Sequence, residues 1–200
     1  MNSNAATLRV AVFPRSGLLT DVLLVLAGTG LIAAAAQLSV KLPFTPVPIT
    51  GQTFAVILVG ASVGSLRGTA SALLYLWLGV AGAPIYAHHD SGWDVITSAS
   101  GGYIVGFVLA AAAAGLLAEH GWDRRFSSSI GAMLTGNVII YLVGLPWLAV
   151  VLGTNLEKTL EYGLYPFVPG DMFKLYLAAA VLPTAWRLVD RVGPGARTRR

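Results

Sequence analysis

Residues 166–174, PFVPGDMFK, join a proline-punctuated loop to the last apolar segment of the chain and place an acid and a base at its start. Asp171 and Lys174 are three positions apart, so a helix that begins here carries both side chains on one face. An ionisable side chain near the centre of a bilayer costs roughly 2.5 to 3.5 kcal/mol on insertion scales. Two roles could explain the pair: recognition of a ligand, or a local salt bridge that caps the helix.

The composition of the chain is that of an integral membrane protein. Of its 200 residues, 56% are hydrophobic and only 11% are charged, and the mean hydropathy is +0.72. A transmembrane helix needs about 20 predominantly apolar residues. The segment that follows Gly170 supplies one span, and five charge-free runs can each supply another. These runs lie between Asp21 and Lys41, Lys41 and Arg67, Arg67 and Asp90, Asp94 and Glu119, and Arg125 and Glu157.

We therefore predict an all-α integral membrane protein, a six-transmembrane-helix bundle that forms a single membrane domain over residues 1–200. Arg9 and Arg15 precede the first apolar segment, but no clear small-residue cleavage site accompanies them. We expect that segment to be a retained span rather than a signal peptide. The expected helices cover approximately residues 18–38, 52–65, 68–85, 102–118, 129–151 and 170–188.

Basic residues are distributed unequally between the two sides of such a bundle. With both termini inside, the inner segments hold ten arginines, whereas the outer side holds three lysines. Cytoplasmic loops carry the excess of Lys and Arg in membrane proteins. We therefore expect cytoplasmic N- and C-termini in a multi-pass protein of the cytoplasmic membrane, and we attribute the net charge of +4 to topology rather than to a nucleic-acid partner. The basic residues are Arg9, Arg15, Arg67, Arg124, Arg125, Arg187, Arg191, Arg197, Arg199 and Arg200 inside, and Lys41, Lys158 and Lys174 outside.

Sequence motifs for catalysis and for energy coupling do not occur. The glycines at 60, 64 and 68 lack the Gly-Lys-Ser/Thr ending of a phosphate loop, and their spacing of four fits a helix-packing face. Without cysteine, disulfides, thiolate metal sites and a cysteine nucleophile are excluded. His88 and His89 are adjacent, but we favour a hydrated or ligand-contacting loop over a metal site there. We expect no enzyme activity, no metal and no cofactor.

Irregular and polar segments between the apolar runs are candidates for binding a small polar molecule. Residues 41–54, KLPFTPVPITGQTF, contain three prolines within six residues, which exclude a regular helix. Irregular backbone at membrane depth is tolerated where protein or a polar cavity satisfies it, so this segment is either a solvated hairpin or the rim of a ligand site. Asn137 is either a ligand contact or a hydrogen-bonding strut within the bundle. The candidate substrate-binding residues are Gln52, Tyr86, His88, Trp93 as an aromatic lid, Gly101, Gly102, Asn137, Asp171 and Lys174.

Small residues in the first apolar segment recur at a spacing of four. Gly30 and Ala34 form one such pair, and Thr29 and Ala33 form another. Small side chains at this spacing let a second helix approach closely within lipid. They serve either packing inside this bundle or docking to a partner membrane protein, for which Gly30 and Ala34 are the candidate pair.

Taken together, these motifs resemble the BioY family, whose members are biotin-binding S components of energy-coupling-factor (ECF) vitamin transporters. The resemblance extends from the first expected helix to the last. The motifs that carry it are KLPFTPVPITGQT at 41–53, GAPIY at 82–86, GGY at 101–103, GN at 136–137 through GLPW at 144–147, and PFVPGDMFK at 166–174.

The resemblance implies a six-helix bundle whose outer loops close over biotin. It also implies work with a transmembrane coupling protein and two cytoplasmic ATPase subunits, and it implies that Asp171 and Lys174 hold the substrate. The ureido ring of biotin has N–H donors and a carbonyl acceptor, which a carboxylate and an ammonium complement. We therefore expect a high-affinity biotin uptake subunit. An S component for thiamine or a flavin, or a membrane scaffold in which the two charges only pair with each other, are the alternatives.

The chain departs from the family pattern at one loop. The Gly-Pro-Thr-Gly-Gly that often precedes the family's tyrosine is SASGG at residues 98–102, and the loop from 86 to 102 contains no Lys or Arg. Three candidates therefore remain for the group that binds the biotin carboxylate: backbone N–H groups near Gly101, the His88 side chain, and Lys174.

Overall fold

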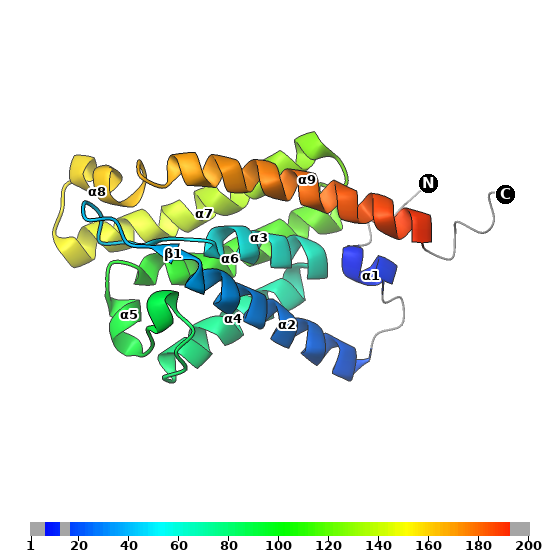
Figure 1. Cartoon of the computed structure of the whole chain (residues 1–200), viewed down its shortest axis with the longest axis horizontal. Coiled ribbons are helices and arrows are strands. Elements are labelled where there is room, and N and C mark those ends of the chain that lie inside the picture. Colours follow the sequence, from blue (N-terminus) through cyan, green and yellow to red (C-terminus); the bar gives the residue numbers. More distant parts are fainter. Residues whose placement is uncertain (1–6, 13–16, 193–200) are drawn as a thin grey trace.

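The computed structural model describes residues 7–12 and 17–192 of the chain, and helices account for most of them (Figure 1). Long helices run alongside one another, and short elements connect them at both ends. The long helices are α2 (Leu18–Gln37), α3 (Gln52–Val63), α4 (Ser65–Val80), α6 (Gly101–Glu119), α7 (Phe126–Leu152) and α9 (Val168–Val192). The short elements are α1 (Leu8–Val12), the 3-10 helix η1 (Ala87–His89), α5 (Trp93–Thr97) and α8 (Leu156–Gly163), with an antiparallel hairpin of β1 (Ser39–Val40) and β2 (Ile49–Thr50).

Four helices in the described part of the chain are long and apolar enough to cross a membrane. They are α2, α6, α7 and the Val168–Val189 portion of α9. The helix α3 is apolar but has only 12 residues, and α4 has 16. Many large apolar side chains on the outside of the bundle are exposed, which suits a surface that faces lipid.

The helix α4 begins and ends earlier than the expected range of 68–85. It begins at Ser65 because the Glu119 carboxylate accepts hydrogen bonds from the Ser65 backbone N–H at 2.8 Å and from its hydroxyl at 2.9 Å. These bonds satisfy donors that a helix N-terminus otherwise leaves free. The helix ends at Val80, and Gly82 follows with a φ of +101°, a left-handed conformation that glycine adopts without strain.

Glycine and alanine residues let α3, α4 and α6 meet at the centre of the bundle. A Cβ atom added to Gly60 would lie 2.4 Å from the Ala111 carbonyl oxygen, and one on Gly68 would lie 2.6 Å from the Gly60 Cα. A Cβ on Gly115 would come equally close to the Ser65 backbone. The glycines at 60 and 68 therefore serve helix packing, but they belong to α3 and α4, and Gly64 lies in the turn between them with a φ of +90°, so the three do not form one helix face as their spacing predicted.

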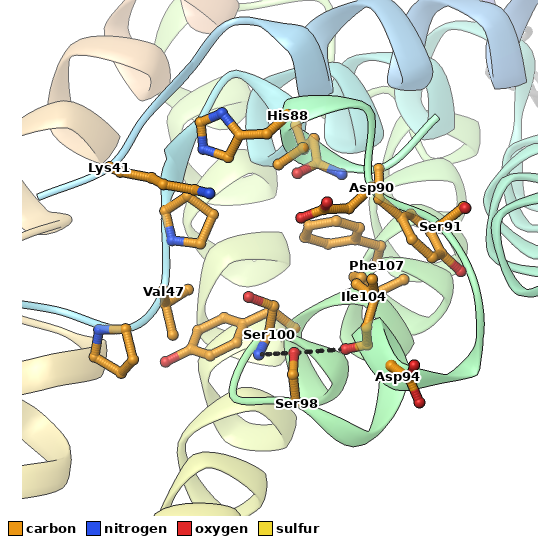
Figure 2. Close-up of a pocket in the computed structure, with 17 residues that line it drawn as sticks. Lys41, Val47, His88, Asp90, Ser91, Asp94, Ser98, Ser100, Ile104 and Phe107 are labelled. Carbon is orange, nitrogen blue, oxygen red and sulfur yellow. Dashed lines mark hydrogen bonds between the residues drawn. The ribbon is translucent and has the colours of Figure 1, made fainter. Parts of the chain in front are cut away.

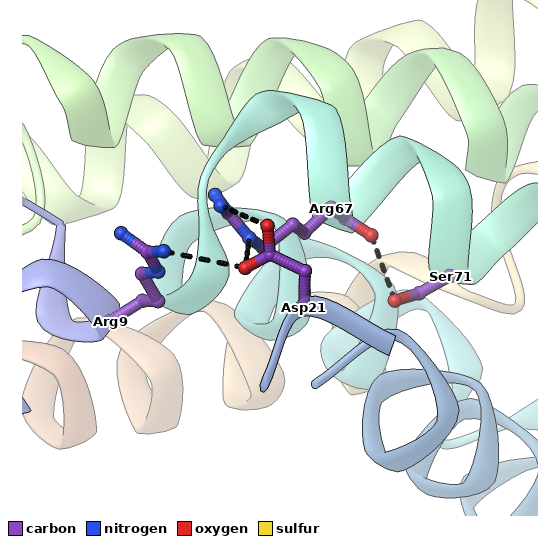
Figure 3. Close-up of polar contacts among 4 residues, drawn as sticks. All are labelled: Arg9, Asp21, Arg67 and Ser71. Carbon is purple, nitrogen blue, oxygen red and sulfur yellow. Dashed lines mark hydrogen bonds and ion pairs between the residues drawn. The ribbon is translucent and has the colours of Figure 1, made fainter. Parts of the chain in front are cut away.

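A cluster of charged residues joins three helices at the end of the bundle where α1 lies (Figure 3). Asp21 of α2 accepts hydrogen bonds from the Arg67 guanidinium of α4 at 2.7 and 2.9 Å. The Arg9 guanidinium of α1 binds the same carboxylate at 3.3 Å. The cluster fixes the ends of α1, α2 and α4 relative to one another.

Candidate functional site

A cavity of about 420 Å³ (Figure 2) lies among α5, β1 and the first turns of α6, elements that Figure 1 shows at the end of the bundle opposite α1. The β1–β2 hairpin, the segment from η1 to α5, and the first turns of α3 and α6 form its walls. Both polar and apolar side chains face it. The lining residues are Lys41, Pro46, Val47, Pro48, Gln52, Tyr86, Ala87, His88, Asp90, Ser91, Asp94, Val95, Ser98, Ser100, Tyr103, Ile104 and Phe107.

The proline-rich hairpin forms one wall because hydrogen bonds hold its irregular backbone in place. The Thr45 hydroxyl donates to the Tyr162 carbonyl of α8 at 2.6 Å and accepts from the Val47 backbone N–H at 3.2 Å. Val47 is buried, while its neighbours Pro46 and Pro48 also line the cavity. The irregular hairpin backbone cannot form regular strand hydrogen bonds, and the Thr45 side chain satisfies part of it while also tying the hairpin to α8.

The opposite wall is a strained turn that Gln37 holds. His88 and His89 both have positive φ angles, 62° and 63°, which are uncommon for residues with a side chain and cost of order 1–3 kcal/mol each. The Gln37 amide nitrogen donates to the Tyr86 carbonyl at 3.0 Å, and its oxygen accepts from the His89 N–H at 3.2 Å. Gln37 therefore stabilises a conformation that the turn would not adopt alone.

Tyr86 anchors the same turn to α4. Its hydroxyl donates to the Leu76 carbonyl at 2.7 Å, and its ring fits against Gly79 so closely that a Cβ there would lie 2.2 Å from the ring. Burial raises the pKa of Tyr86 to about 12. The phenol therefore stays protonated at neutral pH and keeps donating its hydrogen bond.

Gln52 presents its amide at the base of the cavity in a fixed orientation. Its nitrogen donates to the Tyr75 hydroxyl at 2.6 Å, and its oxygen accepts from the Thr50 hydroxyl at 2.9 Å. Both contacts are with protein groups, and Gln52 is buried. The amide is thus held rigidly where α3 begins.

Asp171 and Lys174 form a buried ion pair on α9 that does not line the cavity. The Lys174 ammonium lies 3.1 Å from the Asp171 carboxylate, and the two side chains are only 16% and 10% exposed. Lys174 also donates to the Thr53 hydroxyl at 3.1 Å, and the Tyr141 hydroxyl donates to Asp171. The pair therefore joins α3, α7 and α9 through hydrogen bonds.

One layer of side chains separates this ion pair from the cavity. Tyr103 lines the cavity, and its ring packs edge-to-face against Tyr141 with centres 6.3 Å apart. The Tyr103 hydroxyl donates to the Gly163 carbonyl at 2.9 Å, which holds the ring in position. Gln52 lines the cavity, while its neighbour Thr53 contacts Lys174. Tyr103 and Gln52 of the cavity wall are thus each adjacent to a residue that contacts the ion pair.

The structure brings three of the predicted site residues, Gln52, Tyr86 and His88, to the cavity. Trp93 is 61% exposed and does not line it. Asn137 is buried beside Lys174 at a void of about 10 Å³.

Gly101 and Gly102 lie behind the cavity wall rather than in it. A Cβ on Gly101 would overlap the Ile96 carbonyl oxygen at 1.6 Å, and one on Gly102 would lie 2.3 Å from the Trp147 Cβ. The two glycines therefore let α5 and α7 pack closely against the start of α6.

Several residues of the site did not stand out in the sequence. Lys41, Asp90 and Asp94 line the cavity, as does Tyr103. The sequence holds one signal for Tyr141: it follows Asn137 by four residues, so both side chains lie on one face of α7. Among the described residues, no group of three His, Cys, Asp or Glu side chains is arranged to hold a metal ion.

Comparison with known proteins places the chain in a family. The sequence profile of the BioY family matches residues 3–191. The "Biotin transporter BioY" of Thermotoga maritima is 36% identical over 153 residues, which are 76% of this chain and 88% of that protein. The "Biotin transporter BioY" of Rhizobium etli is 33% identical over 147 residues, 70% of this chain and 78% of that protein.

A solved structure shares the fold. It is the crystal structure at 2.1 Å of "the S-component for biotin from an ECF-type ABC transporter", with a TM-score of 0.73 and 24% identity, covering 91% of this chain and 98% of that one. The predicted all-helical membrane fold and the predicted family resemblance are thus confirmed. The chain belongs to the BioY family.

Proposed function

We propose that the chain captures biotin from the outer side of the membrane as the S component of an ATP-driven ECF-type importer. The observation that carries this proposal is the cavity of about 420 Å³ at the end of the bundle remote from α1. Its size lies within the range of about 300–1,000 Å³ that is usual for small-molecule sites. The relatives from Rhizobium etli and Thermotoga maritima each align with more than two thirds of this chain, and both are described as biotin transporters.

The walls of the cavity suit a ligand with an apolar body and polar ends. Val47, Ile104 and Phe107 offer an apolar surface, and Tyr103 adds an aromatic ring. Burial of apolar ligand surface contributes about 25 cal/mol per Å². The polar lining then fixes the orientation of the ligand, since each unpaired polar group in a buried site costs about 1–3 kcal/mol.

For the ureido ring we propose contacts with Asp171 and Lys174. The pair already supplies a carboxylate acceptor and an ammonium donor within 3.1 Å of each other. It lies one side-chain layer behind Gln52 and Tyr103, so a bound ligand would replace the hydrogen bond from Lys174 to Thr53, while Tyr141 keeps orienting the Asp171 carboxylate. Asn137 at the adjacent void would then face the same ring.

The proposal includes a single membrane domain with six spans and cytoplasmic termini. The helices α3 and α4 measure roughly 18 and 24 Å at 1.5 Å per residue, and each would need a locally thinner bilayer to span it. The arginine-rich segments at the α1 end support a cytoplasmic orientation of that end.

A transmembrane coupling protein and two cytoplasmic ATPase subunits would supply the energy, because the chain encodes no phosphate loop. Gly30 and Ala34 face outward from α2, and a Cβ on Gly30 would meet nothing within 4 Å. That surface is our proposed docking site for the coupling protein.

Titration of the detergent-solubilised protein with biotin tests the proposal, with the five tryptophans as reporters. We expect tight binding, and we expect Asp171→Ala and Lys174→Ala each to weaken it by more than about tenfold, or 1.4 kcal/mol. Lys158→Ala, which removes an exposed lysine of α8, serves as the control.

Three results would change the proposal. Binding of thiamine or riboflavin with no response to biotin would assign a different vitamin. A lack of thermal shift with any of these vitamins would favour a scaffold protein. Unchanged biotin affinity in both α9 variants would remove the ion pair from the site.

A further inference from the structure

We propose that Lys41 and His88 form a carboxylate subsite at the rim of the cavity and set its preference for a ligand with a free carboxyl group. This inference rests on the proposed biotin function and adds an anchor for the ligand's acidic tail. Lys41 is the one Lys or Arg among the described residues that line the cavity. Figure 2 shows its side chain directed into the cavity, with the His88 imidazole on the same side in this view.

The hairpin brings Lys41 and His88 to the same cavity. Lys41 follows directly after β1 (Ser39–Val40), and both Lys41 and His88 line the cavity. The Ser39 hydroxyl lies 3.1 Å from the His88 Nδ1. That contact joins β1 to the η1 turn two residues before Lys41.

His88 has a buried nitrogen that no protein group uses. Its Nε2 atom is shielded from solvent and has no hydrogen-bond partner among the described residues. When the Ser39 hydroxyl donates to Nδ1, the imidazole proton resides on Nε2, which then becomes a hydrogen-bond donor. An unsatisfied buried donor destabilises the fold, and an anionic oxygen would satisfy it.

The backbone of the turn is fixed to present this nitrogen. His88 has a φ of 62°, and Gln37 holds the residues on either side through the Tyr86 carbonyl and the His89 N–H. Strained non-glycine residues persist where surrounding contacts determine them, and they concentrate at ligand sites. The strained backbone aims the imidazole.

The charges around the cavity confine an anion to the hairpin side. Asp90 and Asp94 also line the cavity, and Figure 2 shows Asp90 on the far side from Lys41. Lys41 makes no ion pair with any residue in the described part of the chain, so its ammonium is available. A carboxylate therefore finds attraction at Lys41 and His88 and repulsion at Asp90 and Asp94.

The test compares biotin with biotinamide, in which the carboxyl group is blocked, on the solubilised full chain. We expect the wild type to prefer biotin and Lys41→Ala to lose biotin affinity about fivefold to tenfold without losing affinity for biotinamide. Lys41→Arg should retain the preference because it keeps the positive charge. Lys158→Ala removes the same charge from an exposed site in α8 and should leave both affinities unchanged.

A second pair of variants isolates His88 from the fold of its turn. His88→Gly removes the imidazole where glycine adopts the observed φ without strain, and it should reduce the preference for biotin. His89→Gly is the matched control, since His89 has the same backbone conformation but does not line the cavity. A preference for biotin that persists in both Lys41→Ala and His88→Gly would overturn the subsite, whereas a wild type that binds neither compound would overturn the proposed function itself.

Discussion

The Tyr141 hydroxyl donates a hydrogen bond to Asp171, across the interface between α7 and α9. Asp171 therefore has two protein partners, Tyr141 and Lys174, before any ligand arrives. The carboxylate is oriented by the first and neutralised by the second. This arrangement stabilises a charge that would otherwise be costly in the bundle.

Removal of the Tyr141 hydroxyl should disorder the Asp171 carboxylate while the packing of the ring is kept. We expect Tyr141→Phe to weaken biotin binding roughly tenfold, because loss of a hydrogen bond to a buried charged group costs about 1.5–3 kcal/mol. Fluorescence titration measures the affinity. Tyr165→Phe, at an exposed tyrosine, should leave it unchanged, and equal affinities in the two variants would exclude a positioning role for Tyr141.

A side chain added at residue 79, which lies outside the cavity, should distort the cavity wall. The Cβ atom of Gly79→Ala would lie 2.2 Å from the Tyr86 ring, so Tyr86 and the η1 turn must move. Overpacking of this kind costs typically about 1–3 kcal/mol, and we expect both a lower melting temperature and weaker biotin binding. Gly30→Ala, at an open position of α2, should raise the melting temperature or leave it unchanged. Normal binding by Gly79→Ala would contradict the role of Tyr86 as a cavity wall.

Docking to a coupling protein should depend on the outward face of α2. Gly30→Leu and Ala34→Leu place large side chains where close approach of a partner helix needs small ones. Neither position contacts the cavity, so we expect isolated variants to bind biotin normally and to lose co-purification with the coupling protein and ATPases. Retained assembly in the double variant would move the docking site elsewhere.

A buried acid in the α6–α7 loop should make stability depend on pH. Asp123 is fully buried, one of its oxygens accepts from the Trp186 indole at 2.5 Å, and the other has no partner among the described residues. Burial raises the pKa of Asp123, against a smaller opposing effect of the Trp186 hydrogen bond. The folded state therefore holds the proton more tightly than the unfolded state does. The stabilisation is present below the unfolded pKa of about 3.9 and is lost as pH rises through the folded pKa.

Asp123→Asn should remove this dependence because asparagine stays neutral. We expect the melting temperature of Asp123→Asn, relative to wild type, to increase as the pH is raised from about 4 to 7. Glu157→Gln, at an exposed acid of α8, serves as the control and should show no such trend. A constant difference across this range would show that Asp123 stays charged at all these pH values.

The absence of cysteine allows a direct test of topology. Single cysteines replace Ser127 at the start of α7 and Glu157 in α8, both of which are exposed. A membrane-impermeant maleimide should label Glu157→Cys in intact cells and Ser127→Cys only after permeabilisation. The reverse pattern would place the cavity on the cytoplasmic side and exclude capture of biotin from outside.

The sequence by itself determined the class of fold and the family. Apolar runs separated by charges indicate membrane helices, because a bilayer requires uninterrupted apolar segments with satisfied backbone. The short proline- and glycine-rich motifs carry the family resemblance because their residues have backbone requirements that few other residues meet. Local signals of this kind also identified Asp171 and Lys174 as a pair on one helical face.

Only the tertiary structure decided which polar residues share a cavity. Lys41 and His88 are 47 positions apart, and Tyr141 and Asp171 are 30 apart, so no local pattern connects them. The sequence predicted Gly101 and Gly102 as ligand contacts, and the structure places both where neighbouring helices approach closely. The ends of α4 likewise depend on Glu119, a residue of another helix. Helices form from local composition, whereas a site forms where packing brings distant side chains together, and packing is a property of the whole chain.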